Sequence, residues 1–435
     1  MKSLFYKQFC LFFIMLICFC THLSATNSRA LVIVPVADVV YEPLGDYVQD
    51  VHAAYSELPY AEVSFAHEQE WCERGYQLLF NEIVNVLEER GEEVLVSVPH
   101  IFYKQCREGK PQTEYWLLRE NIMLMSELLE KGITHGSIPQ PIRVDMTDLE
   151  ACNKNTVALR LPFYDTVTQK TYSAGTRFIY TAHTHDEYTV LLFDAAAQKL
   201  VSTSIPVERT IEYTEKSPSE RVNDFVQLVR LWADMPQGII PYVWGGASFT
   251  YLLAQDNFST KRIIKRNGCA RTIFVQNEMS SIPYTGFDCS CLISRAAQLC
   301  GLPYFLGNSA TIEYTLPTLK ASESIKEGDI IWFHGHVVVI SNISENMIVE
   351  ARGYGSGFGR IHEVKIGQLF KEIKTIEQLK KAYIAQTPVT ILNKEGQERM
   401  VITQFKICKL SGIWPKNQEY LEDFIQHDTM IVEKV

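Results

Sequence analysis

Three residues of this 435-residue chain, Cys289, His336 and Glu350, carry the side chains that a cysteine nucleophile requires. A thiol attacks a carbonyl carbon as a thiolate, so it needs a base that takes its proton and a polar group that orients the base. Histidine is the usual base, and a neighbouring carboxylate fixes the tautomer of its imidazole and stabilises the protonated ring. If the fold brings the three side chains together, they support acyl-transfer chemistry.

The sequence around Cys289 predicts a buried helix that begins at this cysteine. Asp288 is a favoured N-cap residue, Gly301 is a favoured stop, and mostly apolar residues lie between them. At the first helical position, unpaired N–H groups and the positive end of the dipole are expected to lower the thiol pKa. The competing interpretations are an inert buried cysteine and a metal site of Cys289, Cys291 and Cys300. Because no second pair at zinc-type spacing accompanies them, we expect neither a metal nor another cofactor.

The base and its orienting group are expected on a β-hairpin. The apolar runs Val337–Ile340 and Met347–Ala351 are separated by turn residues, and pairing them brings Glu350 near His336, within a residue or two of register. His334 shares a strand face with His336, because side chains alternate with a period of two. The residues alone therefore leave the choice between the two histidines open, and either could be an ordinary strand residue with a satisfied hydrogen bond.

Four short motifs, in this order, resemble the NlpC/p60 cell-wall cysteine peptidases. They are Pro241-Tyr242-Val243-Trp244-Gly245-Gly246, Phe287-Asp288-Cys289-Ser290, Gly328-Asp329 and His336-Val337. The β-rich blocks upstream are similar to the bacterial SH3-like barrels that precede this domain in the γ-D-glutamyl-diamino-acid endopeptidases. The resemblance implies an α+β fold, with a papain-like NlpC-type peptidase domain preceded by two β-rich SH3-like barrels.

The resemblance also implies a role for each candidate residue. Cys289 is the nucleophile, His336 and not His334 is the base, and Glu350 takes the place of the third polar residue. Tyr242 would lie beside the oxyanion together with the Cys289 backbone N–H. In the first barrel, relatives bind the free amine of an N-terminal L-Ala with an acidic residue and a tyrosine. The residues that would hold the peptide here are Asp288, Ser290, Ser309 and Trp244 in the peptidase domain and Glu82 and Tyr115 in the first barrel.

Three features depart from the family pattern. Cys291 stands where the family usually has glycine, so the backbone behind the nucleophile is expected to differ. Glu350 stands where histidine, asparagine or glutamine is usual, and its charge would favour the protonated imidazole. Residues 247–285 form an insertion between two of the motifs, which is either a lid, a docking loop or an inert excursion.

The N-terminus predicts export. Two lysines precede an apolar run from Phe9 to Cys20, which is shorter than the ~20 residues that a membrane-spanning helix needs, and a polar segment follows it. Residues 1–25 therefore have the pattern of a signal peptide, with cleavage at Ala25 or Ala30. We expect a protein of the periplasm, the cell wall or the extracellular space, without stable membrane insertion.

Composition and element spacing set the remaining expectations. A formal net charge of -10 without a basic cluster excludes a nucleic acid partner, and irregular cysteine spacing gives no disulfide framework. We expect a monomer. The predicted domains are a first SH3-like domain with a helical insertion (31–150), a second SH3-like domain (155–215) and the peptidase domain (217–435).

The function expected from the resemblance is hydrolysis of the bond between γ-D-glutamate and a diamino acid, such as meso-diaminopimelate, in peptidoglycan stem peptides. An amine-binding barrel would favour released peptides over intact wall, since the L-Ala amine is free only after removal from the glycan. Two alternatives stay open. One is a thiol amidase or acyltransferase on the same fold, and the other is an inactive wall-binding protein.

Overall fold

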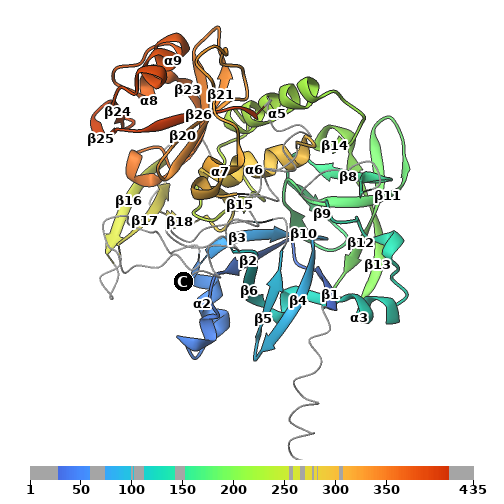
Figure 1. Ribbon diagram of the computed structural model, residues 1–435. Coiled ribbons are helices and arrows are strands. Elements are labelled where there is room, and N and C mark those ends of the chain that lie inside the picture. Colours follow the sequence, from blue (N-terminus) through green and yellow to red (C-terminus); the bar gives the residue numbers. More distant parts are fainter. Residues whose placement is uncertain are drawn as a thin grey trace, which may run out of the picture.

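The computed structural model describes much of the chain after the predicted signal peptide, which itself lies outside the described residues. The described residues are 28–58, 74–98, 101, 112–142, 152–253, 258–264, 270–276, 279–281, 283–302 and 307–410. Within them, two β-sheets form the N-terminal part and a mixed unit of helices and sheet forms the C-terminal part (Figure 1).

The first sheet is antiparallel and has seven strands in the order β3-β2-β6-β5-β4-β1-β7. Pro35 separates its first two strands, as expected of a residue that cannot donate a ladder hydrogen bond. The strands are β1 (Ser28–Val32), β2 (Val36–Val40), β3 (Arg74–Leu79), β4 (Ile83–Arg90), β5 (Glu93–Ser97), β6 (Glu114–Leu118) and β7 (Ile122–Leu124), and the helices beside them are α2 (Val51–Glu57) and α3 (Met125–Glu130).

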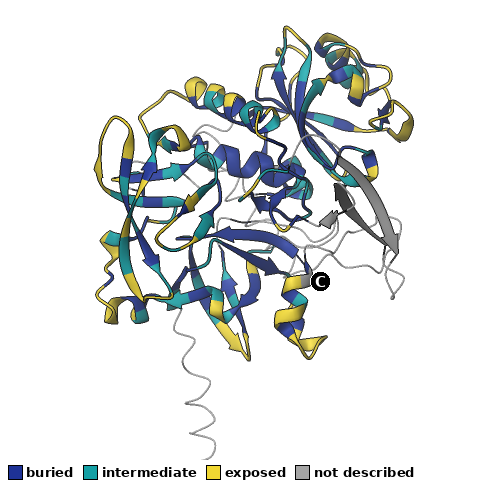
Figure 2. Cartoon of the chain, turned by 180° about the vertical axis from the view of Figure 1, so that it is seen from behind, coloured by how far each residue is buried: buried dark blue, intermediate teal, exposed yellow. Residues whose placement is uncertain are grey.

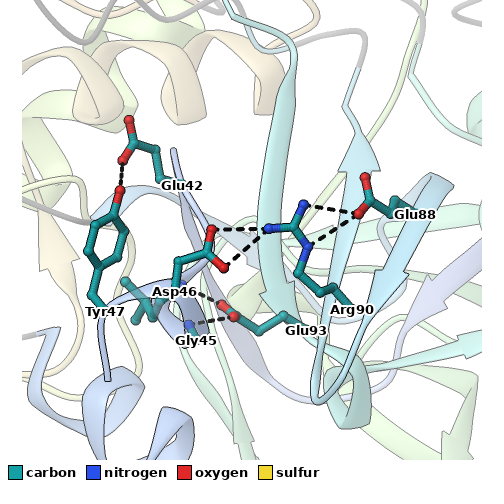
Figure 3. A network of polar contacts seen from close by, with 8 residues as sticks. Glu42, Gly45, Asp46, Tyr47, Glu88, Arg90 and Glu93 are labelled. Atoms are coloured by element: carbon teal, nitrogen blue, oxygen red, sulfur yellow. Dashed lines mark hydrogen bonds and ion pairs between the residues drawn. The ribbon is translucent and has the colours of Figure 1, made fainter. Parts of the chain in front are cut away.

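Two polar networks of contrasting burial lie at the turn between β4 and β5 of this sheet (Figure 3). The buried carboxylate of Glu93 accepts hydrogen bonds from the backbone N–H groups of Leu44 and Gly45 at 2.9 and 2.8 Å, which fixes the turn before α2. The exposed guanidinium of Arg90 pairs with Asp46 at 3.0 Å and with Glu88 at 3.1 Å. Because solvent screens the second network and not the first, Glu93 is expected to contribute more to stability.

The second sheet has five antiparallel strands in the order β13-β12-β11-β8-β14, next to a two-stranded ribbon. Its elements are β8 (Thr156–Leu159), β9 (Phe163–Asp165), β10 (Lys170–Tyr172), β11 (Arg177–His183), β12 (Glu187–Asp194), β13 (Lys199–Pro206) and β14 (Thr210–Glu212). One apolar cluster, with Leu31, Phe80 and Phe178, joins the two sheets. Among the described strands, the two edge strands do not pair with each other in either sheet (β3 and β7 in the first, β13 and β14 in the second), so the expected closed barrels are not observed.

The C-terminal part packs helices on both faces of a five-stranded antiparallel sheet with the order β23-β22-β21-β20-β26. The sheet consists of β20 (Ile330–Phe333), β21 (His336–Asn342), β22 (Met347–Arg352), β23 (Arg360–Lys365) and β26 (Phe405–Cys408). The other elements are α5 (Pro218–Ala233), α6 (Cys289–Leu299), α7 (Ser309–Thr315), α8 (Ile366–Leu369), α9 (Ile376–Ala385), β24 (Val389–Leu392) and β25 (Glu398–Ile402).

Separate apolar clusters cover the two faces of this sheet. One contains Trp332 and Val337 with helices α5 and α6, and it continues into the first sheet. The other contains Val338 and Ile340 with α8 and α9. Alternate residues of β21 thus face opposite clusters, as the period of a strand requires. In the described part, none of the helices is long and apolar enough to cross a bilayer.

The predicted insertion at 247–285 contains strands. Short strands β15 (Ala247–Ser248) and β19 (Gly286–Phe287) pair with each other at its base, antiparallel. Between them, β16 (Phe258–Ile264), β17 (Ala270–Gln276) and β18 (Met279–Ser281) form an antiparallel sheet of three strands. The pairing of β15 with β19 brings the WGG motif next to the start of α6.

Candidate active site

Helix α6 begins at Cys289, as the sequence predicts. The Oδ1 atom of Asp288 accepts hydrogen bonds from the backbone N–H groups of Ser290 and Cys291, at 2.9 and 2.7 Å, and from the Ser290 hydroxyl at 2.9 Å. The helix ends before Gly301, whose φ of +68° is the left-handed value usual after a helix. Asp288 and Ser290, which the resemblance assigns to substrate binding, therefore also fix the position of the nucleophile.

The helix is buried between three neighbours. It packs against α5 and against strands β21 and β22, and its residues 289–297 are buried (Figure 2). The backbone N–H of Val337, which directly follows His336, acts on the Cys289 thiol by lowering its pKa. The start of α6 therefore lies beside β21.

The structure reverses the expected direction of the Cys289 pKa. Burial, with only 7% of the residue exposed, raises the pKa of the thiol, and the charge of Asp288 raises it further. Hydrogen bonds from the backbone N–H groups of Val337 and Ser290 lower it, but they do not outweigh burial. The resting group is the neutral thiol, so a base must take its proton before it attacks.

The predicted hairpin brings that base to its carboxylate. Strands β21 and β22 pair antiparallel, with a bulge between Ile340 and Asn342, and the Nε2 atom of His336 lies 2.7 Å from Oε2 of Glu350. His334 lies in the turn before β21 and is exposed. The contact confirms the expected neighbourhood of His336 and Glu350, and the bulge explains why their register could be predicted only to within a residue or two.

Two further cationic or N–H-bearing side chains surround Glu350. The Nε2 atom of His362 lies 3.0 Å from Oε1, and Nη1 of Arg352 lies 3.6 Å from the same oxygen. Burial alone would raise the pKa of Glu350, but the charge of Arg352 and the hydrogen bonds from His336 and His362 hold it well below its usual value. The 1% exposed carboxylate is therefore ionised.

Tyr242 lies between the nucleophile helix and the edge of the sheet. Its N–H donates to the Gly359 carbonyl at 2.9 Å, before β23, and it forms a parallel bridge with Phe287, two residues before Cys289. The ring of Tyr354 meets its ring edge-on, with centroids 6.0 Å apart, and the Tyr354 hydroxyl donates to its carbonyl. The half-buried Tyr242 is thus fixed at its backbone.

The glycines of the WGG motif are explained by close backbone approaches. Gly245 has a φ of +62°, and a Cβ there would lie 2.8 Å from the carbonyl oxygen of Arg74 in β3. At Gly246 a Cβ would lie 2.4 Å from the Gly286 carbonyl oxygen. A side chain at either position would separate the first sheet or β19 from the motif. Trp244, just before them, is half-buried.

The remaining predicted substrate residues occupy different surroundings. Ser309 is the first residue of α7, and its carbonyl accepts a hydrogen bond from Trp332 Nε1 at 2.5 Å. Glu82 accepts from Arg295 at 2.7 Å through Oε1 and from the Leu79 N–H at 3.0 Å through Oε2. Tyr115 is 0% exposed and donates to the Gln112 carbonyl at 2.5 Å. Tyr115 therefore presents no surface to a ligand here.

Sequence reasoning missed His362, Arg352 and Arg295. His362 lies directly opposite Glu350 in the pairing of β22 with β23, so a three-strand prediction beyond Ala351 would have found it. Among the described residues, no group of three or more His, Cys, Asp or Glu side chains is arranged to hold a metal ion. Cys289, Cys291 and Cys300 are not joined in disulfide bonds in this structure.

Comparison with known proteins gives structural neighbours only. No family model matches the chain, and no curated protein matches it. It is similar to an NlpC/P60 family protein from Bacillus cereus, with 15% identity over 78% of this chain and 94% of that one and a TM-score of 0.45. It is also similar to NlpC2 from Trichomonas vaginalis, with 10% identity over 79% of this chain and 94% of that one and a TM-score of 0.28. A third similar structure is the peptidoglycan hydrolase RipB from Mycobacterium tuberculosis, with 18% identity over 36% of this chain and 67% of that one and a TM-score of 0.20.

Proposed function

We propose that this chain is a cysteine peptidase that hydrolyses the bond between γ-D-glutamate and a diamino acid, such as meso-diaminopimelate, in peptidoglycan stem peptides. The observation that carries the proposal is the 2.7 Å contact of His336 Nε2 with Glu350, at the start of strand β21, which packs against the helix that begins at Cys289. The four ordered motifs support a cell-wall peptide as the substrate.

In the proposed reaction, the thiol proton passes to His336 while the Cys289 sulfur attacks the γ-carbonyl carbon of the D-glutamyl residue. Glu350 stabilises the positive charge that the imidazole gains. The Cys289 N–H, which has no acceptor within its own helix, and the Tyr242 hydroxyl stabilise the oxyanion. His336 then protonates the leaving amine. A water molecule, deprotonated by His336, finally releases the acyl group from the sulfur.

The proposed substrates are released stem peptides with a free N-terminal L-Ala. The contact of β3 with the WGG motif supports this choice, because Arg74 brings the first sheet against Gly245, close to the start of α6. The proposed location is the periplasm or the cell wall, because residues 1–25 have the pattern of an export signal.

The direct test is incubation of the chain without residues 1–25 with L-Ala-γ-D-Glu-meso-diaminopimelate, followed by mass spectrometry. The expected product is L-Ala-γ-D-Glu, and Cys289→Ala should abolish its formation. Cys300→Ala is a matched control, since Cys300 is a free thiol at the other end of α6 with the same 7% exposure, and it should keep activity. Full turnover by Cys289→Ala would refute the proposed nucleophile.

The same preparation separates the alternatives. Labelling of Cys289 by a thiol reagent without turnover of any stem peptide would favour an amidase or acyltransferase acting on another acyl group. Sedimentation with peptidoglycan without thiol labelling would favour a wall-binding protein. An N-acetylated L-Ala substrate tests the free amine, because a site that binds the ammonium group should turn the acetylated peptide over more slowly.

A further inference from the structure

We propose that Arg352 and His362 are positioning residues that occupy one oxygen of Glu350, so that the other oxygen serves His336 as a fixed acceptor with a partly neutralised charge. The proposal rests on the proposed function in one respect, namely that His336 acts as a base towards Cys289. Neither Arg352 nor His362 belongs to the four motifs from which the sequence predicts the site.

The two oxygens of Glu350 have separate partners. Oε2 contacts His336 Nε2 at 2.7 Å, whereas Oε1 contacts His362 Nε2 at 3.0 Å and Arg352 Nη1 at 3.6 Å. The four groups come from three adjacent strands, since His336 lies in β21, Glu350 and Arg352 lie in β22, and His362 lies in β23. A carboxylate held at both oxygens cannot rotate away from the imidazole.

The chemistry of a carboxylate fixes the tautomer of His336. An ionised carboxylate only accepts hydrogen bonds, so the Nε2 atom of His336 must carry a hydrogen and donate it. In the neutral ring, Nδ1 then carries the lone pair that can take a proton from Cys289. Glu350 therefore selects the tautomer that the proposed reaction needs, provided that it stays ionised and in place.

His362 is the second imidazole that contacts Glu350. Its Nε2 donates to Glu350 for the same reason, and its Nδ1 is buried with no hydrogen-bond partner among the described residues. The ring of Phe358 stacks on it, with centroids 4.0 Å apart and planes at 19°, and so fixes its orientation.

Arg352 supplies the compensating charge. Its Nη2 atom donates to the Leu392 carbonyl at 2.5 Å, and its guanidinium lies 5.3 Å from the centroid of the Phe358 ring. These contacts hold the cation beside Oε1 without placing it on the oxygen that serves His336. The charge of Arg352 offsets part of the charge of Glu350, so the imidazolium faces a carboxylate whose field is weakened. This arrangement answers why a glutamate can stand where the family usually has a neutral side chain or histidine.

The titratable and charged groups around this site come from four elements besides β22 and from β22 itself. They are Asp288 and Cys289 at the start of α6, His336 from β21, Glu350 and Arg352 from β22, His362 and Arg360 from β23, with Arg360 directly opposite Arg352, and the pair of Arg230 from α5 with Glu363 from β23. Loss of the Arg352 charge would strengthen the field of Glu350 on His336. The stronger field would stabilise the thiolate–imidazolium pair, which would then form at lower pH.

The test measures the rate of Cys289 alkylation by iodoacetamide between pH 4 and 10, read on the Cys289 peptide by mass spectrometry. For Arg352→Met we expect the apparent pKa of alkylation to fall by about one unit, which is a tenfold faster reaction on the acid limb. His362→Leu should shift the profile in the same direction. Arg352→Lys, which keeps the charge, and His362→Gln, which keeps an N–H donor, should shift it less than half as far.

Arg90→Met, a change of an exposed arginine in the first sheet, is the control for nonspecific effects and should leave the profile unmoved. Melting temperatures of all variants distinguish a loss of stability from a change in the reactivity of Cys289. Loss of a purely structural residue would lower the melting temperature without moving the pH profile of alkylation. An unmoved profile in both Arg352→Met and His362→Leu overturns the proposal. Since alkylation needs no peptide, this result is independent of whether stem peptides are cut, so failure of the proposed substrate is recognised separately.

Discussion

Arg295 is expected to be the side chain of α6 whose loss destabilises the fold most. It lies six residues after Cys289, about 9 Å along the helix, and its side chain is 0% exposed. The guanidinium donates to Glu82 at 2.7 Å, to the Ala247 carbonyl at 3.1 Å and to the Gln77 carbonyl at 3.3 Å. It thereby connects the nucleophile helix to the first sheet and to β15.

Replacing Arg295 by methionine keeps much of the volume and removes the charge. Removal of one partner of a buried ion pair costs ~3–5 kcal/mol, because the other charge is left uncompensated. Glu82 is 16% exposed and keeps its hydrogen bond from the Leu79 N–H, so the cost of leaving its charge unpaired is expected at the lower end of that range. The carbonyls of Ala247 and Gln77 also lose their donor, which adds to the cost. We expect a loss of about 4 kcal/mol in the free energy of unfolding.

The assay is urea unfolding followed by tryptophan fluorescence, together with turnover of the stem peptide. Arg90→Met is the matched control, because Arg90 also pairs with carboxylates but is 48% exposed (Figure 3), and it should cost no more than ~1 kcal/mol. The double variant Glu82→Gln, Arg295→Met should regain about 2 kcal/mol, since the unpaired charge is gone. A loss in Arg295→Met no larger than in Arg90→Met would refute the reasoning.

Three further predictions concern pH and backbone shape. Burial opposes ionisation of Glu350, but its donors hold the pKa well below the value of 4.5 that is ordinary for glutamate. Its stabilising contribution is therefore complete above that pH and is lost as pH falls, and the difference in unfolding free energy between the wild type and Glu350→Gln should shrink below pH 4.5. Burial raises the pKa of Asp329 to about 6 against its hydrogen bonds, so the folded state binds the proton more tightly and Asp329 costs stability at neutral pH. Asp329→Asn should gain about 3 kcal/mol in urea titrations at pH 7, and the gain should vanish below about pH 4. Gly245→Ala should cost about 2 kcal/mol in the same assay, because φ is +62° and the new Cβ would meet the Arg74 carbonyl. Gly396→Ala, at φ +76° in open space, should cost about 1 kcal/mol. Equal losses in the two variants would contradict the importance of the close approach.

The parts of the site that could be predicted from sequence depend on local contacts. Asp288 caps the helix that starts at the next residue, and Glu350 meets His336 across one hairpin, so both follow from residue type and a period of two. Arg295 and Glu82 are 213 residues apart, and no local pattern connects them. Position along the chain placed Tyr115 at the substrate, yet in the structure its ring is in the core of the first sheet.

The predicted direction of the Cys289 pKa shift was wrong, because burial depends on the tertiary structure. A helix start lowers the pKa of an exposed thiol, but α6 is enclosed by α5, β21 and β22, and desolvation of a thiolate there outweighs the backbone N–H groups. Closed barrels were expected from short strands at close spacing, and that spacing does not determine whether the two edge strands of a sheet pair with each other. Among the described strands both sheets stay open.

Cys289 and Glu350 are buried to a similar degree, and yet they hold opposite charge states for one physical reason. Burial penalises the charged form of both, and only Glu350 has two ring N–H donors and a guanidinium to offset the penalty. Cys289 has backbone N–H donors on one side and the Asp288 carboxylate on the other, so it stays neutral at rest. A charge therefore appears on the sulfur only when its proton has a place on His336, whose positive charge Glu350 already compensates. Activation of the nucleophile is in this way coupled to the carboxylate 14 residues after the base, and through it to Arg352 and His362.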